Sequence, residues 1–240
     1  MSLETGLADR SASESVLDEI GERALEVALS FADEVAGTEV VVLSMAPESA
    51  QATVRKGLAM GAASAVQVVD EGLQGADAVL TAEVLAAALK RVGFDLVIAG
   101  NQSTDGSGGV MAAMVAELLD VPAVTYLNAV EITEGSVSGV RAMDGATARV
   151  QADLPAVISI TESLPDARFP NFKGIMAAKK KPFETLSLND LGIEPLDPAA
   201  SRSIVVGLSE KPPRQAGVKI VDEGDAGEKL AEFLIQHRLA

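Results

Sequence analysis

The segment VIAGNQSTDGSGG, residues 97–109, combines residue types that can bind a phosphate. An apolar run and then an Ala-rich helical pattern flank its polar part, which predicts a strand, a turn and a helix start. The first N–H groups of a helix have no intrahelical acceptor, and the helix dipole favours an anion beside them. Glycines would let a phosphate approach the backbone, and hydroxyl groups could donate hydrogen bonds: Gly106, Gly108, Gly109, Ser103, Thr104 and Ser107. The spacing is neither a P-loop nor a GxGxxG fingerprint, so an ordinary capped turn is the alternative.

A second segment, ARFPNFKGIMAAKKKP at 167–182, is basic and apolar in a chain of formal charge −16. It contains no acid, although the chain has 35 acidic against 19 basic residues. Its cationic residues are Arg168, Lys173, Lys179, Lys180 and Lys181, and its large apolar residues are Phe169, Phe172, Ile175 and Met176. A charge run is most often a solvated face. The aromatic residues favour instead a docking patch, with an apolar centre and a charged rim that steers an acidic partner.

Other chemistries find little support in the sequence. The chain has no cysteine, which excludes disulfides, thiolate metal sites and cysteine catalysis and is typical of a reducing compartment. His237 is the single histidine, so no cluster predicts a metal site, and no nucleophile–base pair predicts an enzyme. The acid excess argues against nucleic acid as a partner. Neither a signal peptide nor an apolar run of membrane-spanning length is present, so a cytoplasmic location is expected.

The elements that would position these segments follow an alternating pattern. Helical spacing over 14–35 predicts a first helix, capped by Ser13 or Ser15. Strands are then predicted at 38–45, 64–70, 94–100 and 121–127, with helices at 48–60, 76–92 and 109–119 between them. Their Val, Leu and Ile runs lack polar alternation, which predicts buried parallel strands in a Rossmann-like α/β fold with flanking helices.

The pattern changes after residue 127. Short β segments and the turns TEGS and DGAT predict an antiparallel hairpin over 128–161 that ends in LPAVISI and returns to the sheet. Pro, Lys and Gly dominate beyond it, so 162–215 is interpreted as an arm ordered mainly by a partner. A short terminal helix is predicted at 225–238. The chain is therefore divided into a nucleotide-binding α/β domain, 1–161, and a partner-recognition loop with a C-terminal arm, 162–240.

The segment LPAVISITESLPDARFPNFKGIMAAKKKPFE, 154–184, resembles the signature of the beta subunit of electron transfer flavoprotein. VLDEIGERALEVAL, RKGLAMGA, DLVIAGNQSTDG and PPRQAGVKI are also similar to family segments and stand in family order. The resemblance implies a fold of the adenine nucleotide alpha-hydrolase type. It also implies a heterodimer with an alpha subunit that holds most of a redox-active FAD, while the beta subunit binds a structural AMP or, in bifurcating members, a second FAD. Electrons would pass from acyl-CoA and related dehydrogenases of fatty acid β-oxidation to a membrane quinone oxidoreductase.

The resemblance also implies site residues. The nucleotide-binding positions would be Asp18, Glu19, Ile20, Gly21, Met45, Gly100, Asn101, Gln102, Ser103, Thr104, Asp105, Gly106, Ser107, Gly108, Gly109, Val110 and Met111. Ile20 would also lie near the flavin of the alpha subunit. The partner-recognition positions would be Arg168, Phe169, Phe172, Lys173, Ile175, Met176, Lys179 and Lys180, with Phe172 at the apolar anchor. No catalytic residue and no metal ligand is implied.

Three departures from the family pattern stand out. Members normally begin with a central strand and loop resembling IVVLVKQVPD, which lies before anything in this chain, so a gap or abnormal pairing is expected in the sheet. LNEPR is replaced by LPDAR, and the nucleotide loop ends in GGVM in place of a more polar run. The alternative from another class is a free-standing adenine-nucleotide-binding regulator of the universal-stress type. That alternative explains the α/β core and the Gly/Ser loop, but it leaves the basic segment unexplained.

Overall fold

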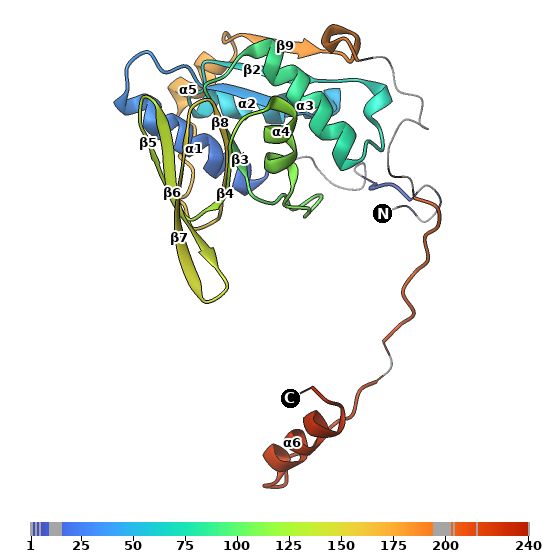
Figure 1. Ribbon diagram of the computed structural model, residues 1–240. Helices are drawn as coiled ribbons and strands as arrows, with labels where there is room; N and C mark the ends of the chain where they lie inside the picture. The colour runs from blue at the N-terminus through green and yellow to red at the C-terminus, as the bar shows by residue number, and fades with distance from the viewer. Residues whose placement is uncertain are drawn as a thin grey trace.

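A computed structural model describes residues 2, 4, 6–9, 16–193, 203, 205–214 and 216–239. Ser13 and Ser15, the expected helix caps, lie outside these residues. The described part forms an α/β body with a projecting hairpin and a C-terminal segment that runs away from it to a last helix (Figure 1).

The predicted alternation of helices and strands is confirmed. The elements are α1 Glu19–Glu34, β1 Val41–Met45, α2 Gln51–Met60, β2 Ser64–Val68, α3 Ala78–Val92, β3 Leu96–Gly100, α4 Met111–Leu119 and β4 Ala123–Leu127, with single-turn helices η2 Glu48–Ala50 and η3 Glu71–Leu73. The cap of α1 is Asp18, whose carboxylate accepts a hydrogen bond from Ile20 N. Asp77 caps α3 in the same way, through Leu80 N. Both helices thus begin where a short acidic side chain satisfies an unpaired backbone N–H group.

The second half of the chain completes the body and adds a separate sheet. Its elements are β5 Ala129–Ile132, β6 Ser136–Met143, β7 Ala146–Asp153, β8 Ala156–Ile160, α5 Phe172–Ala178, β9 Phe183–Leu186, η4 Asn189–Leu191 and α6 Ala226–Gln236. The predicted antiparallel hairpin is present as β6 and β7, with β5 beside β6. The run LPAVISI returns to the main sheet, as expected, but it does so as the parallel strand β8 between β3 and β4 and not as part of the hairpin. All five residues of β8 are buried, as expected of a central parallel strand.

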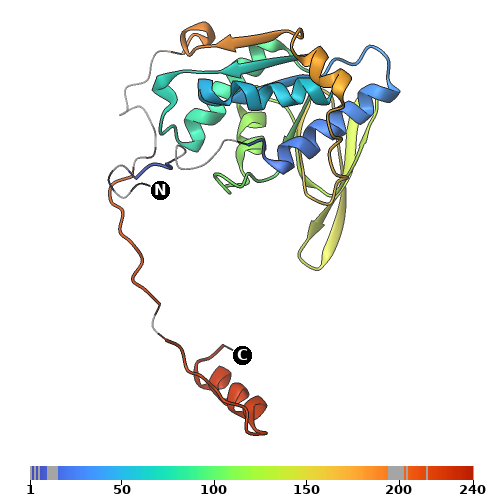
Figure 2. The same cartoon turned by 180° about the vertical axis from the view of Figure 1, so that it is seen from behind.

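Two parallel three-stranded sheets form the body, in the orders β1-β2-β9 and β3-β8-β4. Helices α1, α2 and α5 cover one face, and α3 and α4 cover the other (Figures 1 and 2). The inner strands β2 and β8 are the most buried, whereas β1 and β3 are half-buried throughout. The prediction of fully buried strands is therefore wrong for β1, β3 and β4, because each forms an edge of its sheet. In β4, Ala123 and Tyr126 are exposed.

A cavity separates these two edges. It has a volume of about 1960 Å³ and is lined by β1 and β3 together with apolar residues of α1, α3 and α4. No ladder joins β1 to β3 in the described chain. The expected gap in the sheet is thus confirmed, and two edges of unpaired N–H and C=O groups face a largely apolar space.

The expectation that 162–215 packs poorly on its own subunit is wrong for residues 162–193. Strand β9 pairs with β2, and α5 packs against α2. Leu186 and Leu188 are almost fully buried in the cluster that includes Val68 and Val84. Burial of these side chains supplies the stabilisation that the Pro- and Lys-rich composition did not suggest. By contrast, the described residues 205–214 are all exposed, and the assignment of 162–240 to partner recognition stays a prediction.

Candidate functional site

A pocket of about 330 Å³ lies where α1 begins and β3 ends. It is lined by Asp18, Glu19, Ile20, Arg23, Asn101, Gln102, Ser103, Thr104, Ser107 and Glu162. Two segments that the family resemblance named separately, at 18–21 and 100–111, therefore meet in space. Arg23 and Glu162 were missed. The position of Arg23 one helical turn after Glu19 could have suggested it, because residues four apart share a helix face.

Asp18 holds the loop after β3 against the start of α1. Its Oδ2 accepts hydrogen bonds from Thr104 N at 2.7 Å and Thr104 Oγ1 at 2.6 Å. Burial alone would raise the pKa of Asp18, but the bonds from Thr104 and Ile20 outweigh it and hold that pKa below its usual value. The carboxylate is thus an anchor for the loop, already occupied by donors of its own chain.

The loop is also bonded within itself. Ser107 N and Ser107 Oγ donate to Ser103 O, at 3.0 and 3.2 Å, and Gln102 Nε2 donates to Ser107 O at 2.9 Å. These bonds lead the chain into α4, whose cap residue Val110 provides no side-chain hydrogen bond. The first N–H groups of α4 therefore lack a side-chain cap of the kind that Asp18 gives α1.

Gly100 lets α1 lie close to β3. A Cβ atom at this position would lie 2.6 Å from Ile20 Cγ2, closer than packed carbon atoms approach. Glycine is therefore required for the contact that brings Ile20 beside the loop. The proximity of Ile20 to the 100–111 segment rests on this packing as well as on Asp18.

Met45 is not brought to the pocket. It ends β1 and packs with the core cluster around β2, whereas the pocket lies at the end of β3 on the other side of the cavity. The turn after Met45 is fixed by Gln67, whose amide donates to Ala46 O at 3.2 Å and Pro47 O at 2.9 Å. The distal loop residues 108–111 likewise lead toward α4 and do not line the pocket.

The predicted recognition segment presents its apolar residues to solvent. Phe169 is 94% and Phe172 80% exposed, and Ile175 and Met176 are each about half exposed. Asn171 caps α5 by accepting from Gly174 N at 2.8 Å, so Phe172 stands on the first turn of a short helix. The four residues Phe169, Phe172, Ile175 and Met176 are called the apolar patch below. Lys173, Lys179 and Lys180 are exposed around it.

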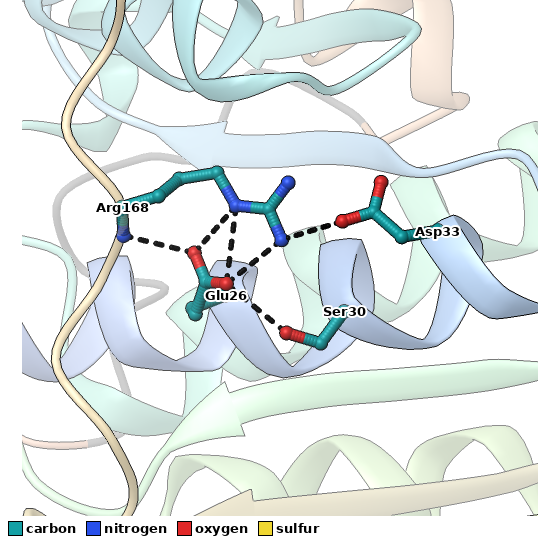
Figure 3. Close-up of polar contacts among 4 residues, drawn as sticks. All are labelled: Glu26, Ser30, Asp33 and Arg168. Atoms are coloured by element: carbon teal, nitrogen blue, oxygen red, sulfur yellow. Dashed lines mark hydrogen bonds and ion pairs between the residues drawn. The ribbon is translucent and has the colours of Figure 1, made fainter.

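Arg168, in contrast, is bound to α1 (Figure 3). Its Nε and Nη2 donate to the two carboxylate oxygens of Glu26 at 2.8 Å each, and Nη2 also lies 2.9 Å from an Asp33 oxygen. Its backbone N–H donates to Glu26 at 2.9 Å. Arg23, one turn before Glu26 on α1, adds hydrogen bonds to Leu164 O and to the carboxylate of Asp166. The observed role of Arg168 is to hold the loop on α1, and contact with a partner stays a prediction.

Lys181 differs from the two lysines before it. Its Nζ donates to Leu58 O at 3.0 Å, Gly61 O at 3.0 Å and Ala62 O at 2.6 Å. It thereby satisfies carbonyl groups at the end of α2, where a cation is also favoured by the helix dipole. Burial lowers the pKa of Lys181. The triple lysine is therefore split between a structural residue and two solvent-exposed charges.

The clamp between Glu26 and Arg168 is expected to open in acid. The Arg168 hydrogen bonds hold the pKa of Glu26 below its usual value, so the clamp stabilises the loop at pH above about 4.3 and is lost as pH falls through the lowered pKa. Glu26→Gln should raise the amide exchange rate of residues 166–169 about tenfold at pH 7, because the charge-assisted hydrogen bonds from Arg168 are lost. In this variant, acid should no longer accelerate the exchange of these residues beyond its general effect on amides.

Hydrogen exchange with mass spectrometry between pH 3.5 and 7 measures this effect. Glu131→Gln, at an exposed position of β5, is the matched control and should behave as the unsubstituted chain. Equal exchange of 166–169 in the Glu26→Gln variant and the unsubstituted chain at pH 7 would show that the clamp does not order the loop.

The part of the chain that the structure describes offers neither a metal cluster nor a membrane-spanning helix. The described residues contain no group of three or more His, Cys, Asp or Glu side chains that could hold a metal ion. Among the described helices, none is both long and apolar enough to cross a membrane.

Comparison with known proteins finds similarity to electron transfer flavoproteins. A model of the electron transfer flavoprotein domain matches residues 5–191. An electron transfer flavoprotein subunit beta of Mycobacterium bovis is 44% identical over 239 residues, covering 96% of this chain and 90% of the relative. The subunit beta of Bacillus subtilis is 30% identical, covering 97% and 89%. The caffeyl-CoA reductase-Etf complex subunit CarD of Acetobacterium woodii is 35% identical over 192 residues, covering 80% of this chain and 73% of the relative.

Proposed function

The chain belongs to the electron transfer flavoprotein family, as a relative of its beta subunits, and we propose that it pairs with an alpha subunit, binds AMP and helps to position FAD. The observation that supports this proposal is the junction of α1 with the 100–107 loop through Asp18 and Thr104. That junction places a small polar pocket and the open start of α4 in one region. Similarity over nearly the whole chain favours a flavoprotein subunit over a free-standing regulator.

AMP is preferred to a second FAD as the nucleotide in this chain. A volume of about 330 Å³ is at the lower end of the range for small-molecule sites, which suits a mononucleotide better than a dinucleotide. The phosphate would face the backbone N–H groups of Gly108 and Gly109 and the start of α4, since Ser107 N already donates to Ser103 O. The adenine and ribose would take the pocket between Ile20 and Asn101.

In the proposed heterodimer the chain is an electron carrier component without catalytic residues of its own. FAD, when bound, supplies the redox chemistry. This chain would contribute Ile20 near the flavin, the fixed orientation of α1, and a surface for donors. We propose that acyl-CoA and related dehydrogenases dock on the apolar patch in the cytoplasm and that a membrane quinone oxidoreductase accepts the electrons.

Gly108→Val is expected to remove AMP from the heterodimer while leaving FAD in place. A Cβ atom at Gly108 would meet only Val110 Cγ2 at 3.8 Å, so valine fits the free loop but takes the space that a phosphate needs. AMP content should fall from about one to below about a tenth per heterodimer, because close approach to the backbone is lost.

The test co-expresses this chain with a candidate alpha subunit, followed by gel filtration, a flavin absorbance spectrum and chromatography of the nucleotide released by heating. Gly135→Val is the control, since its Cβ would meet nothing within 4 Å and it lies between β5 and β6, away from the loop. Unchanged AMP content in Gly108→Val would reject the phosphate site, and failure to form a flavin-containing heterodimer would reject the proposed function as a whole.

A further inference from the structure

Tyr126 has a backbone conformation that residues other than glycine seldom adopt. It lies in β4 with φ of 60°, in the left-handed region, where a non-glycine residue is uncommon. The pairing of β4 with β8 shifts register between Val124 and Leu127, around this residue. Its backbone N–H donates at 2.9 Å to the Oγ of Ser159, which is only 2% exposed. A buried side chain of the neighbouring strand therefore supports the unusual conformation.

This conformation directs the Tyr126 side chain to the turn before α4. The hydroxyl group donates to Gly109 O at 2.9 Å. Gly109 itself has a φ of 64°, and a Cβ atom there would lie 2.2 Å from the Tyr126 hydroxyl oxygen. Gly109 directly precedes Val110, the cap residue without a side-chain hydrogen bond. The two residues thus fit together only because position 109 has no side chain.

The bond fixes the orientation of one peptide group. The carbonyl of Gly109 and the N–H of Val110 belong to the same planar unit and point in opposite directions. While Tyr126 holds the carbonyl, the N–H of Val110 must point away from Tyr126. A flip of this unit would turn the N–H back and place a carbonyl oxygen where an anion would meet it.

We propose that Tyr126 is a positioning residue for the nucleotide phosphate, acting through the Gly109–Val110 peptide group. It keeps the turn at Ser107 to Val110 in the orientation that offers N–H groups at the start of α4. The ligand class is a nucleoside monophosphate, and the inference rests on the proposed AMP binding. Tyr126 is not among the residues that line the pocket, so its effect is indirect.

The test measures AMP binding to the heterodimer by calorimetry after bound nucleotide has been removed. Tyr126→Phe keeps the ring and removes only the hydroxyl group. The dissociation constant for AMP should rise about five- to tenfold, the effect of losing one hydrogen bond that orders the site. Amide exchange at 107–110 in the nucleotide-free protein should increase by a similar factor, whereas FAD content should stay unchanged.

Two further readouts separate positioning from a general loss of structure. Tyr126 is the single tyrosine and the chain has no tryptophan, so tyrosine emission of this chain, measured without the alpha subunit, reports this residue alone. AMP should change that emission saturably, and adenosine, which has no phosphate, should change it less. Gly109→Ala on its own should weaken AMP binding strongly, because the added Cβ would lie 2.2 Å from the Tyr126 hydroxyl oxygen. In the Tyr126→Phe background the same substitution should weaken AMP binding less, because the nearest ring carbon lies 3.4 Å from that Cβ.

The outcomes are distinct. Unchanged AMP affinity or unchanged exchange at 107–110 in Tyr126→Phe overturns the positioning role while the proposed function stands. A wild-type heterodimer that contains FAD but binds no AMP overturns the nucleotide part of the proposed function, and the phosphate role of Tyr126 with it. Weaker AMP binding together with faster exchange at 107–110 supports the inference.

Discussion

Adding a strand that fills the cavity between β1 and β3 should raise the free energy of unfolding of this chain by about 3 kcal/mol or more. The cavity of about 1960 Å³ is bordered by two parallel edges, and residues of α1, α2, α3 and α4 contribute to its walls. A segment such as IVVLVKQVPD, fused ahead of residue 1, would pair with both edges and lead into α1. This geometry is that of an ordinary βα unit in a parallel sheet.

The expected size of the effect comes from what already lines the cavity. Burying each Val, Leu or Ile of the added strand contributes about 1.5–3 kcal/mol, but ordering each residue costs about 1–2 kcal/mol. These terms nearly cancel for the strand itself. The net gain comes from half-buried residues such as Leu43, Leu96 and Ile98, which would become fully buried, and from pairing the open backbone groups.

Urea unfolding followed by circular dichroism measures the change, and both the midpoint and the slope should rise, because more surface is buried in the folded state. The control is an extension of equal length with proline at alternate positions, which cannot donate to either edge. Equal stabilisation by the two extensions would contradict strand insertion and indicate unspecific apolar contact.

The interrupted sheet also shows what sequence patterns can predict here. Apolar runs located β1, β2, β3 and β4 to within a few residues, since period and composition are local properties. The separation of β1 from β3 followed from the family resemblance alone. Burial was overestimated for both strands, because a run of Val and Leu cannot reveal whether its neighbour in the sheet is present.

The basic segment shows that composition cannot distinguish exposed cationic side chains from those bound within the fold. Its charge and aromatic residues indicated an exposed surface, and the apolar patch and two lysines are indeed exposed. Arg168 and Lys181 have the same residue types but are bound to α1 and to the end of α2. Their partners are more than a hundred positions away, so composition could not separate them from Lys179 and Lys180. Composition could not indicate the conformation of Tyr126 either, because its left-handed backbone depends on Ser159 of a neighbouring strand, 33 positions along the chain.

Phe172→Ala should weaken docking of a reduced acyl-CoA dehydrogenase on the heterodimer by about 2 kcal/mol or more, roughly thirtyfold, as for a central aromatic hot spot. Phe172 is 80% exposed on the first turn of α5, and the clamp of Arg168 on Glu26 fixes the loop that leads to it. Such a residue can enter a partner's pocket without first leaving a core. Most of the change should be faster dissociation, because the apolar contact acts only once the proteins have met.

The exposed lysines should act on a different step. Lys179→Glu together with Lys180→Glu should slow association and reduce its salt dependence, since on this proposal the two charges would steer an acidic partner over a longer distance. Lys181 must be left in place, because its Nζ binds three carbonyl groups at the end of α2 and its loss would disturb the fold. Arg168 must also be kept, for the clamp that it forms.

Electron transfer from the reduced dehydrogenase, titrated with each heterodimer at two ionic strengths, separates the two effects. Met143→Ala is the matched control, because Met143 is 56% exposed at the tip of the β6–β7 hairpin, outside the apolar patch. All variants should retain FAD and its absorbance, since the patch is not part of the proposed cofactor site. If Phe172→Ala and Met143→Ala give the same half-saturation concentration, the patch is not the docking surface. Loss of the salt dependence in the lysine variant alone would then mean that the charges steer a partner to another face.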